Sequence, residues 1–331
     1  MEINEHSLKL LRHRFCEDYR VSCSVLTDPY FTERLTILNK EFGYLDSYNK
    51  YLEYVQTNYK SVEEFLEAYH TLRNTIIATV SNSDAYKDFL SDEKITKEIK
   101  EYVPVIGDIN LYTQEQVKDG NNYFLSFDMK KANFQTLKWI NPAIVFDCDT
   151  YEDFMRKFTD MEIAINSKKT REIIFGKLNP NRTTKYEKIL MGVVEETIRQ
   201  TPITKWFDLF SLNNDEVIYK LKPGLNYKDA INACSKYVDE EHIKNLTGID
   251  VKMEFFELVC YHFKTQASDK IMNVFVKRHH TGRNEYKCAN EVYFPQTYKL
   301  INGIEVNDND LAFYYDKTEL AKFFTPIEMV D

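Results

Sequence analysis

Alternation of apolar and polar residues is clearest in the stretch YFLSFDMKKANF, which begins at Tyr123. A period of two predicts a β-strand over 122–128, ending in Asp128. The following residues predict the opening of a helix over 130–139. A carboxylate at the end of a strand can hold a metal ion or a reacting group. It can equally cap the helix that follows.

The first third of the chain has the period of helices. SVEEFLEAYHTLRNTIIATV begins with Ser61 as a predicted N-cap, and Glu64 three residues later completes a capping-box pattern. One apolar face follows, formed by Phe65, Ala68, Tyr69, Leu72 and Ile76. DEKITKEIKEYV predicts a second, more polar helix. A turn pattern marks a boundary near residue 105.

Strands and helices mix beyond that boundary. KYEKILMGVVEETIRQ is an amphipathic helix pattern, and two apolar runs around Asn213-Asn214 predict a β-hairpin. A helix over 227–239 and further strands follow, with a final strand pair expected within 291–315. We therefore predict an α+β fold in which a helical N-terminal region, 1–105, precedes a palm-like antiparallel sheet with packed helices, 106–331. A fingers-like helical insertion is expected at about 150–200.

Composition narrows the class of protein. The chain has 331 residues, 43% hydrophobic and 29% charged, which is typical of a folded protein with a large core. The net charge of −9 argues against general adhesion to nucleic acid or anionic membranes. Six cysteines without a CxxC pair fit free thiols, and no signal peptide or membrane span is visible. These features predict a cytoplasmic or intracellular protein, and abundant Lys, Asn, Ile, Tyr and Phe suggest a virus- or phage-like, AT-rich genome.

A second acidic feature lies at the tip of the predicted hairpin. Asp215 and Glu216 directly follow the turn, next to apolar runs that imply a buried hairpin. Buried carboxylates need neutralisation. If this hairpin neighbours the strand that ends in Asp128, the acids converge and favour two Mg²⁺ ions, or Mn²⁺, between them. Asp128 and Asp215 are then the expected metal ligands, and Asp128, Asp215 and Glu216 the expected catalytic residues.

A concentrated basic stretch separates the two acidic elements. It runs from Ser167 to Lys188 and includes Arg171, Lys177 and Arg182, which are candidates for binding a nucleoside triphosphate. The alternative is a solvated basic helix face.

The order of these elements resembles motifs A, B and C of palm-domain nucleic-acid polymerases over about residues 120–222. SFDMKKANFQTLK resembles motif A and NNDEVIYKL motif C, with an Asp-Glu pair like that of family A DNA polymerases. REIIFGK loosely resembles their fingers helix. Asn214 stands where family A has His, the Arg-x-x-x-Lys spacing is not clean, and the separation of Asp128 from Asp215 is closer to that of reverse transcriptases. The resemblance implies a template-dependent or template-independent nucleotidyltransferase, DNA or RNA polymerase-like, acting on nucleic acid and nucleoside triphosphates.

Two further clusters carry weaker signals. Lys277, Arg278 and Arg283 form a basic cluster that could contact a nucleic-acid backbone or belong to a solvated loop. Asp147 and Asp149 resemble a strand-borne Asp-x-Asp metal motif, or Asp149 caps the next helix. The alternatives to a polymerase are therefore a non-catalytic nucleic-acid-binding or assembly protein with a degenerate palm, possible protein partners included, and a metal-dependent phosphohydrolase.

Overall fold

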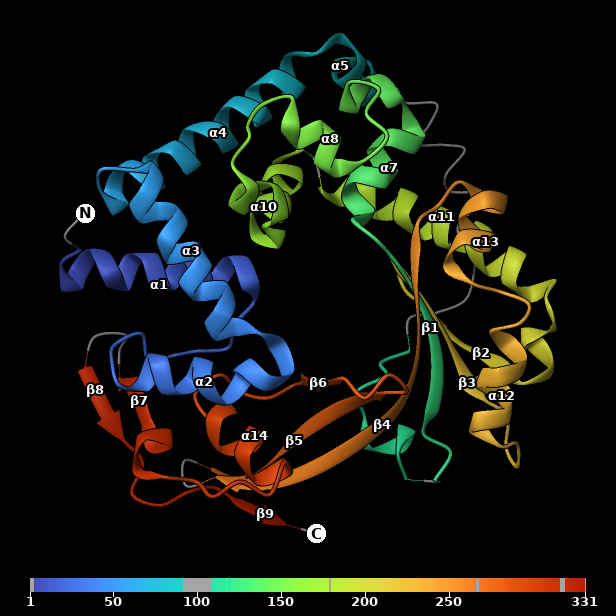
Figure 1. Cartoon of the computed structure of the whole chain (residues 1–331). Helices are drawn as coiled ribbons and strands as arrows, with labels where there is room; N and C mark the ends of the chain where they lie inside the picture. Colours follow the sequence, from blue (N-terminus) through green and yellow to red (C-terminus); the bar gives the residue numbers. More distant parts are fainter. Residues whose placement is uncertain are drawn as a thin grey trace.

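The chain has an α+β fold, as the sequence predicts (Figure 1). The computed structural model describes residues 3–91, 109–118, 120–178, 180–265, 268–315 and 319–330. Its N-terminal region is helical, and an antiparallel sheet follows. The polar helix predicted from DEKITKEIKEYV and the boundary near residue 105 lie outside the described residues.

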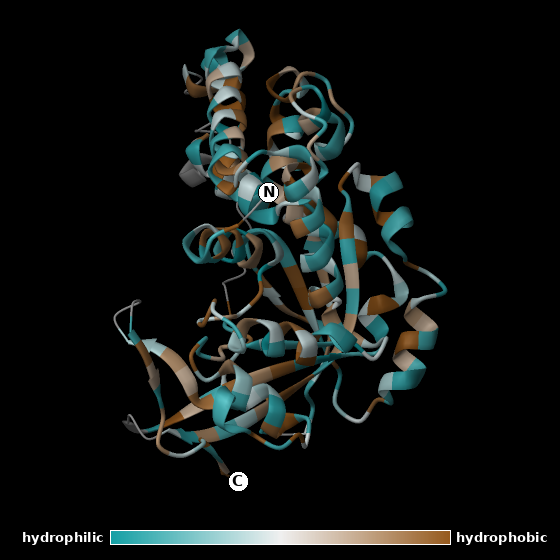
Figure 2. Cartoon of the chain, turned by 60° about the vertical axis from the view of Figure 1, so that its left-hand side comes forward, coloured by the Kyte–Doolittle hydropathy of each residue, from teal (hydrophilic) through white to brown (hydrophobic). Residues whose placement is uncertain are grey.

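Helices form the N-terminal region. They are α1 (Glu5–Tyr19), α2 (Tyr30–Phe42), α3 (Tyr44–Asn58), α4 (Val62–Asn82) and α5 (Asp84–Ser91). The predicted start of α4 is confirmed, because the Ser61 side chain accepts a hydrogen bond from the backbone N–H of Glu64 at 3.1 Å. Figure 2 shows the alternation of apolar and hydrophilic segments along these helices.

One antiparallel sheet organises the second part of the chain. Its strands are β1 (Tyr123–Met129), β2 (Phe207–Leu212), β3 (Glu216–Leu221), β4 (Val251–Thr265), β5 (Ser268–His279), β6 (Asn284–Lys287) and β9 (Glu328–Val330). The order is β2-β3-β1-β4-β5-β6, with β9 paired to β4. A separate hairpin joins β7 (Ala312–Tyr315) and β8 (Glu319–Lys322).

Further helices connect and cover these strands. They are α7 (Ala132–Ile140), α8 (Tyr151–Arg156), α9 (Glu162–Asn166), α10 (Lys168–Lys177), α11 (Pro180–Arg199), α12 (Tyr227–Cys234), α13 (Glu240–Thr247) and α14 (Phe294–Ile301). Because strand side chains alternate, Leu125, Phe127 and Met129 of β1 enter a core formed with α11, α12 and α13. Ser126 and Asp128 face the opposite side of the sheet.

The N-terminal helices share their core with residues from the second part of the chain. One apolar cluster runs from Leu11 and Phe65 through Phe134 and Phe154 to Tyr186. The predicted helical insertion at about 150–200 therefore packs on the N-terminal helices as well as on the sheet.

A second contact, between α2 and the C-terminal part of the chain, completes the ring of elements seen in Figure 1. Glu41, in α2, accepts hydrogen bonds from the backbone N–H of Asn284 at 3.1 Å and from the hydroxyl of Tyr298 in α14 at 3.1 Å. Leu38 of α2 packs beside Tyr298 in a small apolar cluster. The N-terminal helices are thus joined to the C-terminal part of the chain on one side of the ring.

The expected final strand pair within 291–315 is wrong for its first half, which forms α14. Phe294, Tyr298 and Ile301 recur at helical spacing, and Pro295 occupies the first turn, where its missing N–H is tolerated. Within 291–315 only β7 is a strand, and its partner β8 lies beyond that range. The aromatic residues of this segment suggested a strand, but their helical spacing was the better indicator of its structure.

Asp18 fixes α10 to the N-terminal helices through a buried polar network. Its carboxylate accepts hydrogen bonds from Arg14 at 2.7 Å, from Ser167 at 2.5 Å and from Tyr51 at 3.1 Å. Ser167 is the N-cap of α10, and its hydroxyl also accepts from the backbone N–H of Thr170 at 2.9 Å. This network holds the first turn of α10 in a fixed position.

We expect Asp18→Ala to destabilise the protein by about 3–5 kcal/mol, because it leaves the buried Arg14 guanidinium without its counter-charge. Chemical denaturation followed by circular dichroism measures the change. Asp88→Ala, at an exposed position of α5, is the control and should change stability by less than about 0.5 kcal/mol. Equal effects of both substitutions would show that the network does not hold the helices together.

Candidate active site

Asp128 lies in the middle of the sheet, directly beside the acidic hairpin. It pairs with Glu216 of β3 on one side and with Lys252 of β4 on the other. The backbone N–H of Met129 donates to the carbonyl of Asp215 at 2.7 Å. The expectation that strand 122–128 pairs with the Asn213-Asn214 hairpin in one antiparallel sheet is therefore confirmed.

The alternative role of Asp128 as a helix cap is wrong. Asp128 lies within β1, and α7 begins only at Ala132. Lys131, in the left-handed conformation with φ of 51°, occupies the N-cap position, and its side chain makes no capping hydrogen bond. The carboxylate of Asp128 thus has no structural task at the start of this helix.

The surroundings of Asp128 are strongly acidic. Burial, followed by the charges of Glu216, Asp215 and Glu254, raises the pKa of Asp128 to about 7, while Lys277 acts in the opposite direction. Like charges held together in a partly buried place favour either a proton or a bound cation. The site therefore has the electrostatic character of a cation-binding position.

Glu216 differs from the two aspartates because it already has a partner. Its Oε1 lies 3.5 Å from the Nζ atom of Lys277, whose side chain is only 6% exposed. The same Nζ lies 4.5 Å from the centroid of the Phe256 ring. Neither Asp128 nor Asp215 forms an ion pair with another residue in the described ranges, so these two carboxylates remain available for a cation.

Cavities lie on both sides of Asp128 along the sheet. One of about 310 Å³ is lined by Asp215 and Glu216, together with Tyr112 and its neighbours. Another of about 190 Å³ is lined by Lys252, Glu254 and His279, among others. The register of β1 places Asp128 between the strands that carry these two groups of lining residues.

One basic residue of α10, Lys168, lies close enough to Asp128 for their charges to interact. The pKa of Lys168 is lowered by burial and then by Arg20 and Arg171, while the charge of Asp128 opposes the shift. The Arg171 guanidinium lies over the Tyr151 ring, 5.5 Å from its centroid. Lys168 and Arg171 are one turn apart, and thus share a face of α10.

The other two candidate triphosphate ligands are placed differently. Lys177 is exposed at the end of α10, nine residues after Lys168 and therefore about 180° round the helix from it. The side chain of Arg182 lies outside the described residues. Of the predicted set, only Arg171 shares a helix face with Lys168.

The basic cluster after β4 is not one surface. Lys277, Arg278 and His279 belong to β5, so they alternate between the two faces of the sheet. Lys277 is buried beside Glu216, and Arg278 is exposed, donating a hydrogen bond to the Tyr261 hydroxyl. Arg283 follows the turn and pairs with Glu254 and Glu285. The sequence left open both contact with a nucleic-acid backbone and a solvated loop for these three cations, because the end of β5 could not be located from it.

Asp147 and Asp149 are not carried by a strand. Residues 142–145 form a 3₁₀ turn, and both aspartates are exposed. Thr150, not Asp149, caps α8, since its hydroxyl accepts from the backbone N–H of Asp153 at 3.1 Å. Asp149 instead pairs with Lys138 at 3.1 Å. The strand on which the phosphohydrolase interpretation depended is absent from this fully described segment.

Glu187 is a buried acidic residue, with its charge coupled to that of Asp215, that the sequence analysis did not select. It is 5% exposed in α11, and burial followed by the charge of Asp215 raises its pKa to about 7. The available signal was its spacing: Glu187 lies three residues before Leu190 and four before Met191, on the apolar side of α11. A carboxylate on the apolar side of a helix is a candidate for a functional position.

Comparisons with protein-family models, curated protein sequences and solved structures found no match to this chain. Within the described residues, no helix is both long enough and apolar enough to cross a membrane. The assignment of this site therefore depends on its own geometry.

The raised pKa of Asp128 gives a pH-dependent stability. A folded-state pKa of about 7 exceeds the usual value of about 3.9, so the native state gains stability from the bound proton and loses it as pH rises through 7. With metal chelated, Asp128→Asn should therefore be more stable than the wild type at pH 8, by up to about 4 kcal/mol, because the pKa difference is about 3 units and each unit corresponds to about 1.4 kcal/mol. The difference should disappear near pH 4.

Thermal or urea unfolding between pH 4 and 9 measures this difference. Asp149→Asn, at a side chain that is 92% exposed, is the control and should leave the shape of the pH profile unchanged. Parallel profiles for the wild type and Asp128→Asn would contradict the acidic environment described for Asp128.

Proposed function

We propose that this protein is a palm-type nucleotidyltransferase that adds nucleotides to a nucleic acid with the help of divalent metal ions at Asp128 and Asp215. The observation that carries the proposal is the pairing of Asp128 with Glu216 and the backbone hydrogen bond from Met129 to Asp215. These contacts bring the acid at the end of β1 beside the acids at the tip of the β2–β3 hairpin. That is the arrangement that the resemblance to motifs A and C implies.

The residues present suit Mg²⁺. Asp128 and Asp215 offer carboxylate oxygens, which are the ligands that Mg²⁺ and Mn²⁺ prefer. Mg²⁺ is commonly held by one or two carboxylates, with water and substrate phosphates completing its coordination. Two such ions would neutralise a triphosphate and stabilise the attacking and leaving oxygens of an in-line displacement.

The other charged residues have distinct roles in the proposal. Lys168 and Arg171 would bind the triphosphate of the incoming nucleotide, because the charge of Lys168 interacts with that of Asp128 and Arg171 lies on the same face of α10. Lys277 would hold Glu216 in place through their ion pair. In the reaction, a hydroxyl oxygen of the nucleic acid bonds to the α-phosphorus, the bond from that phosphorus to the bridging oxygen breaks, and pyrophosphate leaves. The hydroxyl proton passes to water.

A second candidate function is a non-catalytic nucleic-acid-binding or assembly role with a degenerate palm. The ion pair between Glu216 and Lys277 favours it, since one acid of the hairpin is neutralised by the protein itself. The two functions differ in whether Asp128 and Asp215 are required for chemistry.

Asp128→Asn and Asp215→Asn should each abolish Mg²⁺-dependent incorporation of labelled nucleotides. Asn keeps the shape but removes the charge that the ion needs, and loss of several kcal/mol of transition-state stabilisation corresponds to about 10²–10³-fold in rate. Asp147→Asn is the matched control and should retain wild-type incorporation. Undiminished incorporation by both site variants would refute the proposed metal role, and no incorporation by the wild type on any primed or unprimed template would favour the second candidate.

The positively charged face of α10 can be tested by binding. Lys168→Gln combined with Arg171→Gln should weaken the binding of a nucleoside triphosphate by about tenfold or more at low salt, with a smaller loss at high salt where charges are screened. Lys177→Gln, on the other side of the same helix, is the control and should bind as the wild type does. Isothermal titration calorimetry at two ionic strengths measures these affinities. If Lys177→Gln weakened nucleotide binding equally, the helix would contribute only its net positive charge and not specific contacts from Lys168 and Arg171.

A further inference from the structure

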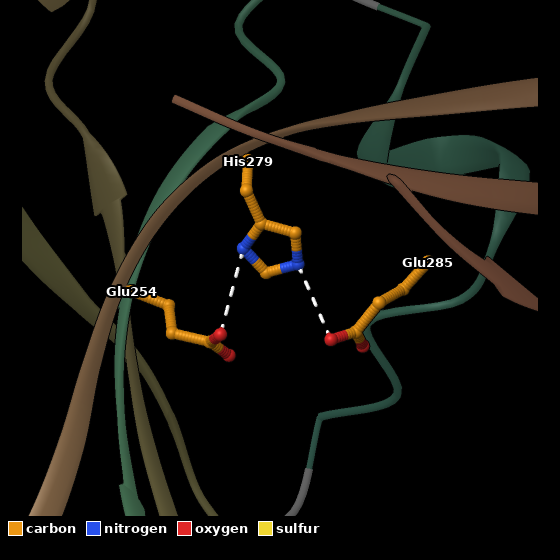
Figure 3. Close-up of side chains that lie close together, drawn as sticks. All are labelled: Glu254, His279 and Glu285. Carbon is orange, nitrogen blue, oxygen red and sulfur yellow. Dashed lines mark ion pairs between the residues drawn. The ribbon is translucent and has the colours of Figure 1, made fainter. Parts of the chain in front are cut away.

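Three metal-ligating side chains meet on adjacent strands beside the proposed active site. Glu254 extends from β4, His279 from β5 and Glu285 from β6 (Figure 3). One ligand atom from each lies within 4.8 Å of the others, and no other group of three His, Cys, Asp or Glu residues in the described part of the chain meets this condition. Antiparallel pairing of β4 with β5 and of β5 with β6 creates the cluster.

The Nε2 atom of His279 and Oε1 of Glu285 have the spacing of two ligands of one ion, because they lie 3.4 Å apart. Oε1 of Glu254 completes the group, since one ligand atom from each residue lies within 4.8 Å of the others. Two ligands bound tetrahedrally at about 2.0–2.1 Å from one ion are about 3.4 Å apart. The imidazole is 3% exposed, so its ring is held in place by the surrounding strands.

A positive group already occupies the point where these atoms converge. The Nη2 atom of Arg283 donates to Oε1 of Glu254 at 2.9 Å, pairs with Oε1 of Glu285, and lies 3.4 Å from Nε2 of His279. One guanidinium nitrogen therefore contacts the three atoms that could coordinate an ion. The arginine shows that this position favours a cation.

We propose that Glu254, His279 and Glu285 form a binding site for a divalent transition-metal ion of the Zn²⁺ or Mn²⁺ type, which exchanges with the guanidinium of Arg283. One imidazole nitrogen and two carboxylate oxygens suit such ions, whereas Mg²⁺ prefers oxygen ligands alone. Two carboxylates and a neutral imidazole balance the charge of one divalent ion.

The surroundings allow this exchange. Arg283 lies just after a turn at Gly282, where φ is +89°, and its side chain is 42% exposed, so it can move into solvent. The cavity of about 190 Å³ lined by Lys252, His279 and Arg283, among others, provides access. Lys252 pairs with Glu254, and the Nζ atom of Lys287 lies 3.1 Å from Oε2 of Glu285, so both carboxylates keep their orientation when Arg283 leaves.

This site is separate from the proposed Mg²⁺ site, although the two are neighbours. Glu254 stands opposite Ser126, two residues before Asp128, and its charge contributes to the raised pKa of Asp128. A transition-metal ion at Glu254 would offset part of this negative charge.

Isothermal titration calorimetry with Zn²⁺ and with Mn²⁺ tests the proposal. Excess Mg²⁺ is present in both titrations, so that it occupies any site made of oxygen ligands alone. We expect one site in the wild type and in Asp128→Asn. His279→Gln and Glu285→Gln should each weaken binding by about 10–100-fold or more. His280→Gln, at the exposed neighbouring histidine, is the matched control and should bind as the wild type does.

Arg283→Ala provides the sharpest result, because removal of the competing guanidinium should tighten binding by about tenfold or more. Adventitious surface binding would not respond in this way. Circular dichroism of each variant checks folding. The proposal fails if neither the wild type nor Arg283→Ala binds either ion, or if His280→Gln weakens binding as much as His279→Gln. It also fails if Arg283→Ala binds more weakly than the wild type.

Discussion

The site depends on the register of β1 between two antiparallel neighbours. Leu125, Phe127 and Met129 fill the core beneath α11, α12 and α13, which forces the intervening Ser126 and Asp128 onto the opposite face. A slip of one residue would place Asp128 in an apolar core, at a large free-energy cost, and would expose the three apolar side chains. Core packing on one face therefore determines the position of the carboxylate on the other. The same pairing places Asp128 opposite Glu216 and beside Asp215.

The N-terminal helices matter to the site because they hold α10, which carries the positive charges. Lys168 and Arg171 lie on α10, whose first turn is held by Asp18 through Ser167. The N-terminal helices are in turn joined to α14 through Glu41. Positioning of the basic residues relative to the acidic sheet therefore depends on contacts between segments far apart in sequence, and those contacts close the ring seen in Figure 1.

Local patterns predicted the elements, but long-range pairing determined which residues meet. The period of two around Tyr123, the Asn213-Asn214 turn and the N-cap at Ser61 are local signals, and the structure has the strand, hairpin and helix that they indicate. The burial of Lys277 against Glu216 follows only from the β5 register and the sheet order, neither of which the sequence pattern contains. The cluster of Glu254, His279 and Glu285 spans three strands, so no spacing along the chain could have indicated it.

Anomalous X-ray diffraction from crystals soaked with Mn²⁺ and a non-hydrolysable nucleoside triphosphate tests the central claim most directly. Mn²⁺ prefers the same oxygen ligands as Mg²⁺ and scatters anomalously. The account predicts an anomalous peak between the carboxylates of Asp128 and Asp215, in contact with the phosphates of the nucleotide, which extend toward Lys168. Absence of Mn²⁺ and nucleotide from this position in crystals that contain both elsewhere would contradict it.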